Sequence, residues 1–144
     1  MERRDFIRLS LTGVGAGIIA PQALAGAEQQ ATISSDIYYT KTSPGRWSGK
    51  VATHLPTIEV TKEAGKTIVK VVTPHEMKGY EHYIVKHVLL DKDYKFLDEH
   101  LFNPLEDKVP LSTFTLENYS GDIHALSLCN KHDLWLNTAN VYRP

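Results

Sequence analysis

The only cysteine in this chain of 144 residues is Cys129, and His132 follows it three positions later. A Cys-x-x-His step can direct a thiolate and an imidazole toward one metal ion. A lone thiol cannot form an intramolecular disulfide, so Cys129 is a buried thiol, a reactive nucleophile or a metal ligand. A cysteine hydrolase would also need an orienting third group and an oxyanion hole, which two positions on one short loop do not supply.

Histidine is the second residue type with metal-binding chemistry, and the chain has seven of them. Three occur in short segments beside predicted strands: His54 in a short loop, His75 after a proline, and His82 where a loop enters a strand. Functional residues commonly lie on loops that a rigid scaffold holds, and loops at one end of a sandwich can converge on one ion. This context favours the metal-ligand role for Cys129.

Period-two patterns from residue 57 onward indicate the short β-strands that must position these residues. The expected strands cover residues 57–61, 67–72, 83–90, 111–116 and 123–129. Ala64-Gly65-Lys66 is typical of a hairpin turn, Asn118–Asp122 is another turn, and no long segment has helical periodicity. The pattern predicts an antiparallel β-sandwich. The polar segment 28–50 is predicted to be a loop-dominated start of the domain.

Alternation along the last predicted strand separates two candidate ligands. Successive side chains of a strand point to opposite faces, so Ile123, Ala125, Ser127 and Cys129 share one face. His124 then points away from Cys129, and we do not expect it to bind the same ion.

The motif Cys-Asn-x-His-x-Leu-Trp at 129–135, together with Glu-His-Tyr-Ile at 81–84 and His-x-Pro at 54–56, resembles the superoxide reductases, the desulfoferrodoxin and neelaredoxin family. The resemblance covers roughly residues 51–135. It implies an immunoglobulin-like antiparallel β-sandwich and one mononuclear iron (Fe2+/Fe3+) with four equatorial histidines and an axial cysteine thiolate. The implied ligands are His54, His75, His82, Cys129 and His132. The family's second iron module needs four cysteines, so one iron per chain is expected.

The resemblance also implies the activity and its partners. Superoxide would be reduced by one electron to hydrogen peroxide, and an electron donor protein, rubredoxin-like or a periplasmic cytochrome, would re-reduce the iron. Family members are often homo-oligomers. His87, His100 and His124 match no ligand position, and we expect structural roles for them, as for Trp47 and Trp135.

Three positions depart from the family pattern. The family's His-Pro-Met reads His75-Glu76-Met77, with one extra residue before His82. Ala52-Thr53 stand where the family has Glu-Lys, whose lysine attracts superoxide and supports protonation, and Lys50 is the nearest candidate to replace that catalytic lysine.

The third departure is Asp133, which stands where glycine is usual. If that position needs a positive φ, aspartate is among the more tolerable replacements. The departures leave an exported iron-binding sandwich without efficient superoxide reductase activity as the alternative function. A metal-free sulfur carrier with a persulfide on Cys129 is the second alternative.

The N-terminus resembles a twin-arginine export signal. Arg3 and Arg4 precede Phe6, a glycine-containing apolar stretch and the small-residue run 23–27, which together predict a cleavable signal over residues 1–27. A single domain, 28–144, of 117 residues would remain after cleavage beyond Ala27, exported by the twin-arginine machinery to the periplasm. Its near-neutral charge favours no nucleic acid, and no second apolar run reaches membrane-spanning length, so no membrane association is expected after cleavage.

Overall fold

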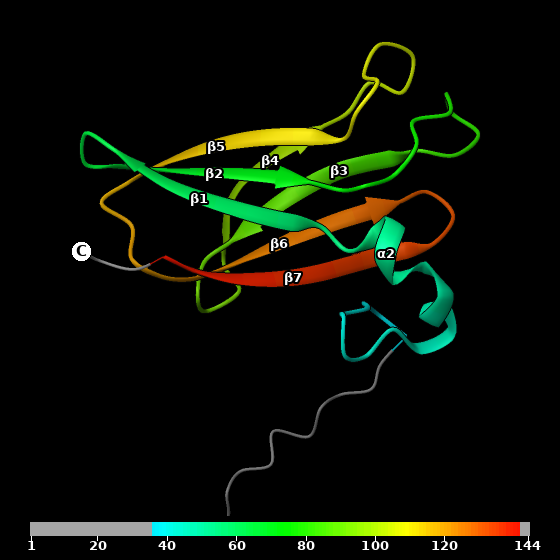
Figure 1. The fold of residues 1–144 in the computed structure, drawn as a ribbon, viewed down its shortest axis with the longest axis horizontal. Helices are drawn as coiled ribbons and strands as arrows, with labels where there is room; N and C mark the ends of the chain where they lie inside the picture. Colours follow the sequence, from blue (N-terminus) through cyan, green and yellow to red (C-terminus); the bar gives the residue numbers. More distant parts are fainter. Residues whose placement is uncertain (1–35, 142–144) are drawn as a thin grey trace, which may run out of the picture. The chain divides into compact units, whose positions relative to one another are not determined.

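The computed structural model describes residues 36–141, so the predicted signal lies outside the described residues. Two antiparallel sheets form the domain, one with strand order β1-β2-β5 and one with order β4-β3-β6-β7 (Figure 1). The strands are β1 (Thr57–Glu63), β2 (Lys66–Val72), β3 (Ile84–Leu90), β4 (Phe96–Leu101), β5 (Leu111–Glu117), β6 (Gly121–Cys129) and β7 (Asp133–Val141). This arrangement confirms the predicted all-β sandwich.

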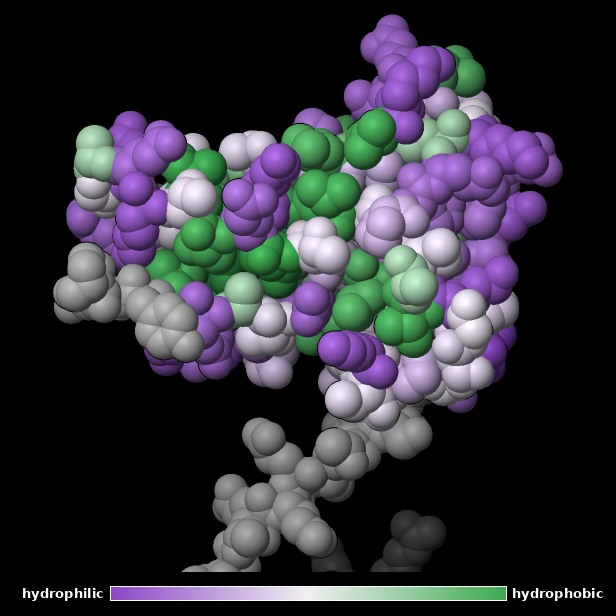
Figure 2. Space-filling model, in the orientation of Figure 1, coloured by the Kyte–Doolittle hydropathy of each residue, from purple (hydrophilic) through white to green (hydrophobic). Residues whose placement is uncertain are grey.

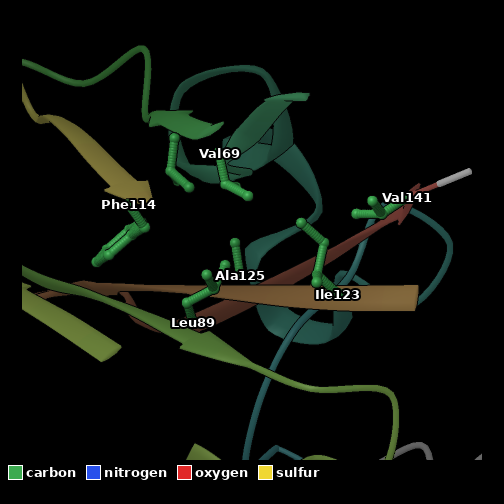
Figure 3. Packing of buried hydrophobic residues seen from close by; sticks show 7 residues of the cluster. Val69, Leu89, Phe114, Ile123, Ala125 and Val141 are labelled. Carbon is green, nitrogen blue, oxygen red and sulfur yellow. The ribbon is translucent and has the colours of Figure 1, made fainter. Parts of the chain in front are cut away.

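The alternating apolar residues of the two sheets meet in a shared core. Val69 and Phe114 from β2 and β5 face Leu89, Ile123 and Ala125 from β3 and β6 (Figure 3). Burial of such side chains is the main force that holds two sheets together. Figure 2 shows apolar surface in the middle of one side of the sandwich and hydrophilic residues toward its two ends. Polar side chains that could bind a ligand therefore lie mainly toward the ends of the sandwich, where the loops are.

The hairpin between β1 and β2 follows the predicted turn. Glu63 pairs with Lys66, and the two residues between them, Ala64 and Gly65, have φ angles of 48° and 79°. Two consecutive positive φ angles give a turn whose twist matches that of the flanking strands. The register of β1 on β2 is fixed by this turn, and it puts Val69 and Val71 of β2 on the core side.

Two strands and two short helical pieces were not expected. β4 carries Asp98, Glu99 and His100 in succession and lies at the edge of its sheet, where none of its side chains is buried. β7 pairs along the whole of β6. The segment predicted as loop contains the 3-10 helix η1 (Gly45–Lys50), and the predicted His54 loop is the single helical turn α2 (Val51–His54). Pieces of six and four residues are too short to show a helical period.

Within residues 36–141, no helix has the length and apolar character needed to cross a membrane.

Candidate metal centre

All five predicted ligand residues lie at one end of the sandwich, at the right in Figure 1. His54 ends α2, while His75 and His82 lie in the connection between β2 and β3. Cys129 ends β6, and His132 lies in the short turn that joins β6 to β7. The antiparallel ladder sets this turn, because Cys129 pairs with Asp133 and leaves three residues between them.

The four imidazole rings form a square of nitrogens. His54 Nε2 lies 3.1 Å from His132 Nδ1, His132 Nδ1 lies 3.2 Å from His82 Nε2, and His82 Nε2 lies 3.0 Å from His75 Nε2. Neighbouring rings have centroids 4.4 to 5.0 Å apart, including His54 and His75 at 4.6 Å. Across the diagonal, the centroids of His54 and His82 are 6.2 Å apart.

The sulfur of Cys129 lies to one side of this square. Its Sγ is 3.4 Å from His82 Nε2, 3.5 Å from His132 Nδ1 and 3.7 Å from His75 Nε2. The thiol is 2% exposed and packs with Ile84 on the core side. Of the four rings, those of His82 and His132 are partly exposed, whereas His54 and His75 are buried.

Hydrogen bonds alone cannot account for this convergence. His82 Nε2 lies within 3.4 Å of two ring nitrogens and one sulfur, yet a neutral ring nitrogen offers one proton or one lone pair. A shared ion accounts for all the contacts. With metal–nitrogen bonds of about 2.1 Å, adjacent corners of a square lie about 3.0 Å apart, which matches the distances here. The donor set of nitrogens and one thiolate suits a first-row transition metal.

The outer nitrogens of three rings are held by protein oxygens. His54 Nδ1 donates to the carbonyl of Lys50 at 3.1 Å and lies 2.8 Å from Thr53 Oγ1. His75 Nδ1 donates to the carbonyl of Glu76, and His82 Nδ1 lies 3.5 Å from the carboxylate of the same residue. Such contacts fix the tautomer and leave the inner lone pair free for a metal.

Burial disfavours the charged forms of three of the clustered histidines and of the cysteine. Desolvation, with repulsion from His75, lowers the pKa of His54 to about 4, and desolvation also lowers the pKa values of His75 and His132. Desolvation raises the pKa of the Cys129 thiol. The neutral form that binds a metal is therefore favoured for these three imidazoles, whereas the thiol must lose its proton when a cation binds.

Lys50 contributes to the site in two ways. Its backbone carbonyl orients His54, and its positive charge is one of the causes that lower the pKa of His132. Thr53, at the position of the family's lysine, bonds instead to the carbonyl of Lys50 at 3.3 Å. A catalytic role for Lys50 stays a prediction, as do the ligand roles of the five clustered residues.

The other three histidines lie outside the cluster. His87 is buried between hydroxyls in the core, and His100 is exposed on β4. His124 stacks on Tyr94 and bonds Thr138 Oγ1 at 2.7 Å, on the face of β6 opposite Cys129.

Sequence reasoning missed several residues that support the site. Glu76 contacts two of the rings, and Trp47, expected to be only structural, packs perpendicular to the His132 ring. Trp135, by contrast, has the structural role expected of it: it is fully buried and donates from Nε1 to the carbonyl of His132 at 2.9 Å. Asp133 has a φ of 63°, which is the condition under which aspartate was expected to be tolerable.

Comparison with known proteins identifies the class to which this β-sandwich with a His4Cys cluster belongs. The desulfoferrodoxin family profile matches residues 46–138, so the chain belongs to the desulfoferrodoxin family. No curated protein sequence matches it.

Among solved structures, the superoxide reductase (neelaredoxin) from Ignicoccus hospitalis is 28% identical, with a TM-score of 0.61 and coverage of 73% of this chain and 94% of that one. A superoxide reductase in the oxidised state is 27% identical, with a TM-score of 0.57 and coverage of 74% and 97%. A variant of the Archaeoglobus fulgidus neelaredoxin in the reduced form is 27% identical, with a TM-score of 0.54 and coverage of 65% and 91%.

Proposed function

We propose that this protein is a superoxide reductase with one mononuclear non-haem iron bound by His54, His75, His82, His132 and Cys129. The observation that carries the proposal is the square of four imidazole nitrogens with a buried sulfur on its core side. The similarity to proteins described as superoxide reductases supports the same reaction.

The reaction needs one electron and two protons for each superoxide and gives one hydrogen peroxide. When bound, the ferrous iron would supply the electron, and an external donor protein, rubredoxin-like or a periplasmic cytochrome, would restore it. Four neutral imidazoles and one thiolate offset only one positive charge of the ion, so the site keeps a positive charge that attracts an anion. Substrate would approach on the side away from Cys129.

Pulse-generated superoxide mixed with the ferrous protein tests the proposal. We expect rapid oxidation of the iron and hydrogen peroxide without dioxygen. Bound iron that superoxide does not oxidise would favour the alternative, an iron-binding sandwich without efficient superoxide reductase activity. A protein without metal, carrying a persulfide on Cys129, would favour the sulfur carrier.

The role proposed for Lys50 is to steer superoxide and to support protonation. The Lys50 carbonyl accepts a hydrogen bond from His54 Nδ1 at 3.1 Å, so the residue lies beside the cluster, and its charge is one cause of the lowered pKa of His132. Lys50→Ala should lower the second-order rate several-fold and flatten its dependence on ionic strength without removing iron. Lys66→Ala is the matched control, because Lys66 is exposed in the β1–β2 hairpin at the other end of the sandwich. Equal rates and salt slopes for both variants would rule out Lys50.

We also propose that residues 1–27 direct export to the periplasm through the twin-arginine machinery and are then removed. The support is the sequence pattern around Arg3 and Arg4. Replacing both arginines by lysine should trap the precursor in the cytoplasm, and the mature protein should begin at Gly26 or Glu28. Normal export of that variant would point to the general secretory route.

A further inference from the structure

His132 differs from the other three histidines in the way its ring is held. Its Nδ1 faces the centre of the square, and no hydrogen bond to its outer Nε2 is formed within residues 36–141. The ring instead packs perpendicular to the Trp47 indole, with centroids 4.8 Å apart and planes at 87°. Packing against Trp47 therefore takes the place that oxygen acceptors occupy beside His54, His75 and His82.

Trp47 is itself fixed by the residue that follows His132 in the chain. The indole Nε1 donates to Asp133 Oδ2 at 2.8 Å, and Arg46 Nη2 donates to the same oxygen at 2.5 Å. The Arg46 guanidinium also lies 4.7 Å from the centroid of the Trp47 ring, and its Nε donates to the hydroxyl of Tyr39 at 3.1 Å. Trp47, Asp133 and Arg46 thus form one hydrogen-bonded clamp around the His132 turn.

The backbone conformation at Asp133 does not explain why a carboxylate occupies this position. Its φ of 63° lies in the left-handed region, where glycine is the least strained residue and aspartate and asparagine are tolerated. The backbone alone therefore does not require a carboxylate there. The hydrogen bonds from the indole and the guanidinium give the carboxylate a separate role.

We propose that Asp133 is a positioning residue for the metal centre. Its carboxylate holds Trp47 against His132 and so fixes the orientation of the one ligand ring whose outer nitrogen contacts no oxygen among the described residues. This inference rests on the proposed function, because it assigns His132 as a ligand. Contacts that orient metal ligands typically change metal affinity by about 10- to 100-fold when they are removed.

Because the backbone at position 133 is left-handed, variants at this position can separate loss of the carboxylate from backbone strain. Asp133→Gly removes the carboxylate and relaxes the backbone, so lost metal affinity cannot be attributed to backbone strain. Asp133→Asn tolerates the same φ, and its amide oxygen can still accept the indole N–H. Trp47→Phe keeps an aromatic edge but cannot donate to Asp133. Glu99→Gln is the control, because Glu99 pairs with Lys86 at 3.3 Å on the β3–β4 surface.

The measurements are the rate of Co2+ release to a chelator, the thiolate-to-cobalt absorption of the loaded protein, and the NMR shift of the Trp47 indole N–H in the metal-free protein. For Asp133→Gly we expect release about 10- to 100-fold faster than in the wild type, an altered absorption band and a shifted indole N–H. Trp47→Phe should release Co2+ faster as well. Asp133→Asn should stay close to the wild type in all three measurements, and Glu99→Gln should match it.

Wild-type release rates and absorption for both Asp133→Gly and Trp47→Phe would overturn the proposal. If Asp133→Gly does not fold, Trp47→Phe decides, with faster release supporting the clamp and unchanged release refuting it. Failure of the wild type to bind Co2+ or iron would instead overturn the proposed function, and the positioning role with it. The two failures are therefore distinguished by the wild-type protein alone.

Discussion

His75 and His87 are both buried, at 8% and 0% exposure, but they have opposite surroundings. In the core, His87 Nε2 lies 2.8 Å from Thr73 Oγ1 and its Nδ1 lies 2.7 Å from Ser112 Oγ. At the end of the sandwich, His75 donates to one backbone carbonyl, while its Nε2 faces another imidazole nitrogen and the sulfur of Cys129.

This difference shows that the partners of a buried histidine, rather than its burial, indicate its role. A hydroxyl can both donate and accept, so the two hydroxyls beside His87 satisfy a neutral imidazole in either tautomer. Nitrogens that face each other cannot all be satisfied without a cation. The two regions are also neighbours in the chain. Thr73, which bonds Ser127 Oγ at 2.7 Å, precedes His75 by two residues, and Ser127 precedes Cys129 by two.

The largest difference between the regions should appear on removing a ligand. His75→Ala and Cys129→Ala should lower iron occupancy sharply, and Cys129→Ala should abolish the thiolate-to-iron charge-transfer band while the sandwich still folds. The reason is that each side chain contributes one donor atom to the cluster and little to the main core. Metal analysis and visible absorption, with circular dichroism as the check on folding, measure this. A Cys129→Ala protein that kept the wild-type band would contradict the assignment.

The second-largest effect should be the loss of stability in acid that the core histidine causes. Desolvation lowers the pKa of His87 to about 3 from the ordinary 6.5, so between pH 6.5 and 3 the unfolded chain binds a proton at this residue that the folded chain does not. The contribution of neutral His87 to stability is therefore fully present above pH 6.5. It falls as the pH drops, and by linkage the free energy of unfolding decreases by about 5 kcal/mol by pH 3 through this residue.

The measurement is urea unfolding of the metal-free protein across this pH range, beside His87→Gln, which cannot titrate. Other histidines contribute to both proteins, so the difference in slope isolates His87. Because His54, with its pKa of about 4, titrates in the same window, some acid sensitivity should persist in the variant. Identical slopes for the two proteins would show that His87 is not buried in its neutral form.

Much of the fold was predictable because the apolar alternation is strong where the strands are buried on one face. Thr67–Val72 and Ile123–Cys129 have this pattern and form most of β2 and β6. β4 was not predicted because its run Asp98-Glu99-His100 is exposed at a sheet edge and has no alternation to recognise. The helical turn that carries His54 is held by tertiary contacts and by the hydrogen bond from the Leu55 N–H to the Val51 carbonyl. A single turn is too short to produce a helical pattern in the sequence, so it was not predicted.

The candidate site was predictable as a set of residues, since a lone cysteine and loop histidines stand out by type. Its supporting contacts were not. The carbonyl of Lys50 and the indole of Trp47 act through geometry that depends on how residues 45–54 pack against the His132 turn. The pairing of Trp47 with Asp133 spans 86 positions, and no local signal marks it.

Removing the core histidine should affect stability but not the metal. His87→Ala leaves Thr73 and Ser112 without their shared partner and opens a cavity against Phe102, so we expect a loss of about 3 kcal/mol in the free energy of unfolding. Iron occupancy of the folded variant should equal that of the wild type. Urea unfolding and metal analysis test both parts, and loss of iron from a folded His87→Ala protein would show that the core network is needed for metal binding.

The smallest effect should come from His100, the residue that pairs with His87 across β3 and β4. Both rings lie against Phe102, with centroids 4.7 and 4.9 Å away, but the His100 side chain is exposed to water and makes no hydrogen bond within residues 36–141. His100→Ala should therefore change the free energy of unfolding by less than about 0.5 kcal/mol and leave iron occupancy unchanged. Repulsion from His100 also helps to lower the pKa of His87, so its removal should raise that pKa slightly and make the free energy of unfolding fall slightly less in acid. A loss of stability as large as that of His87→Ala would mean that position on the sheet, rather than the partners of the ring, decides what a histidine contributes.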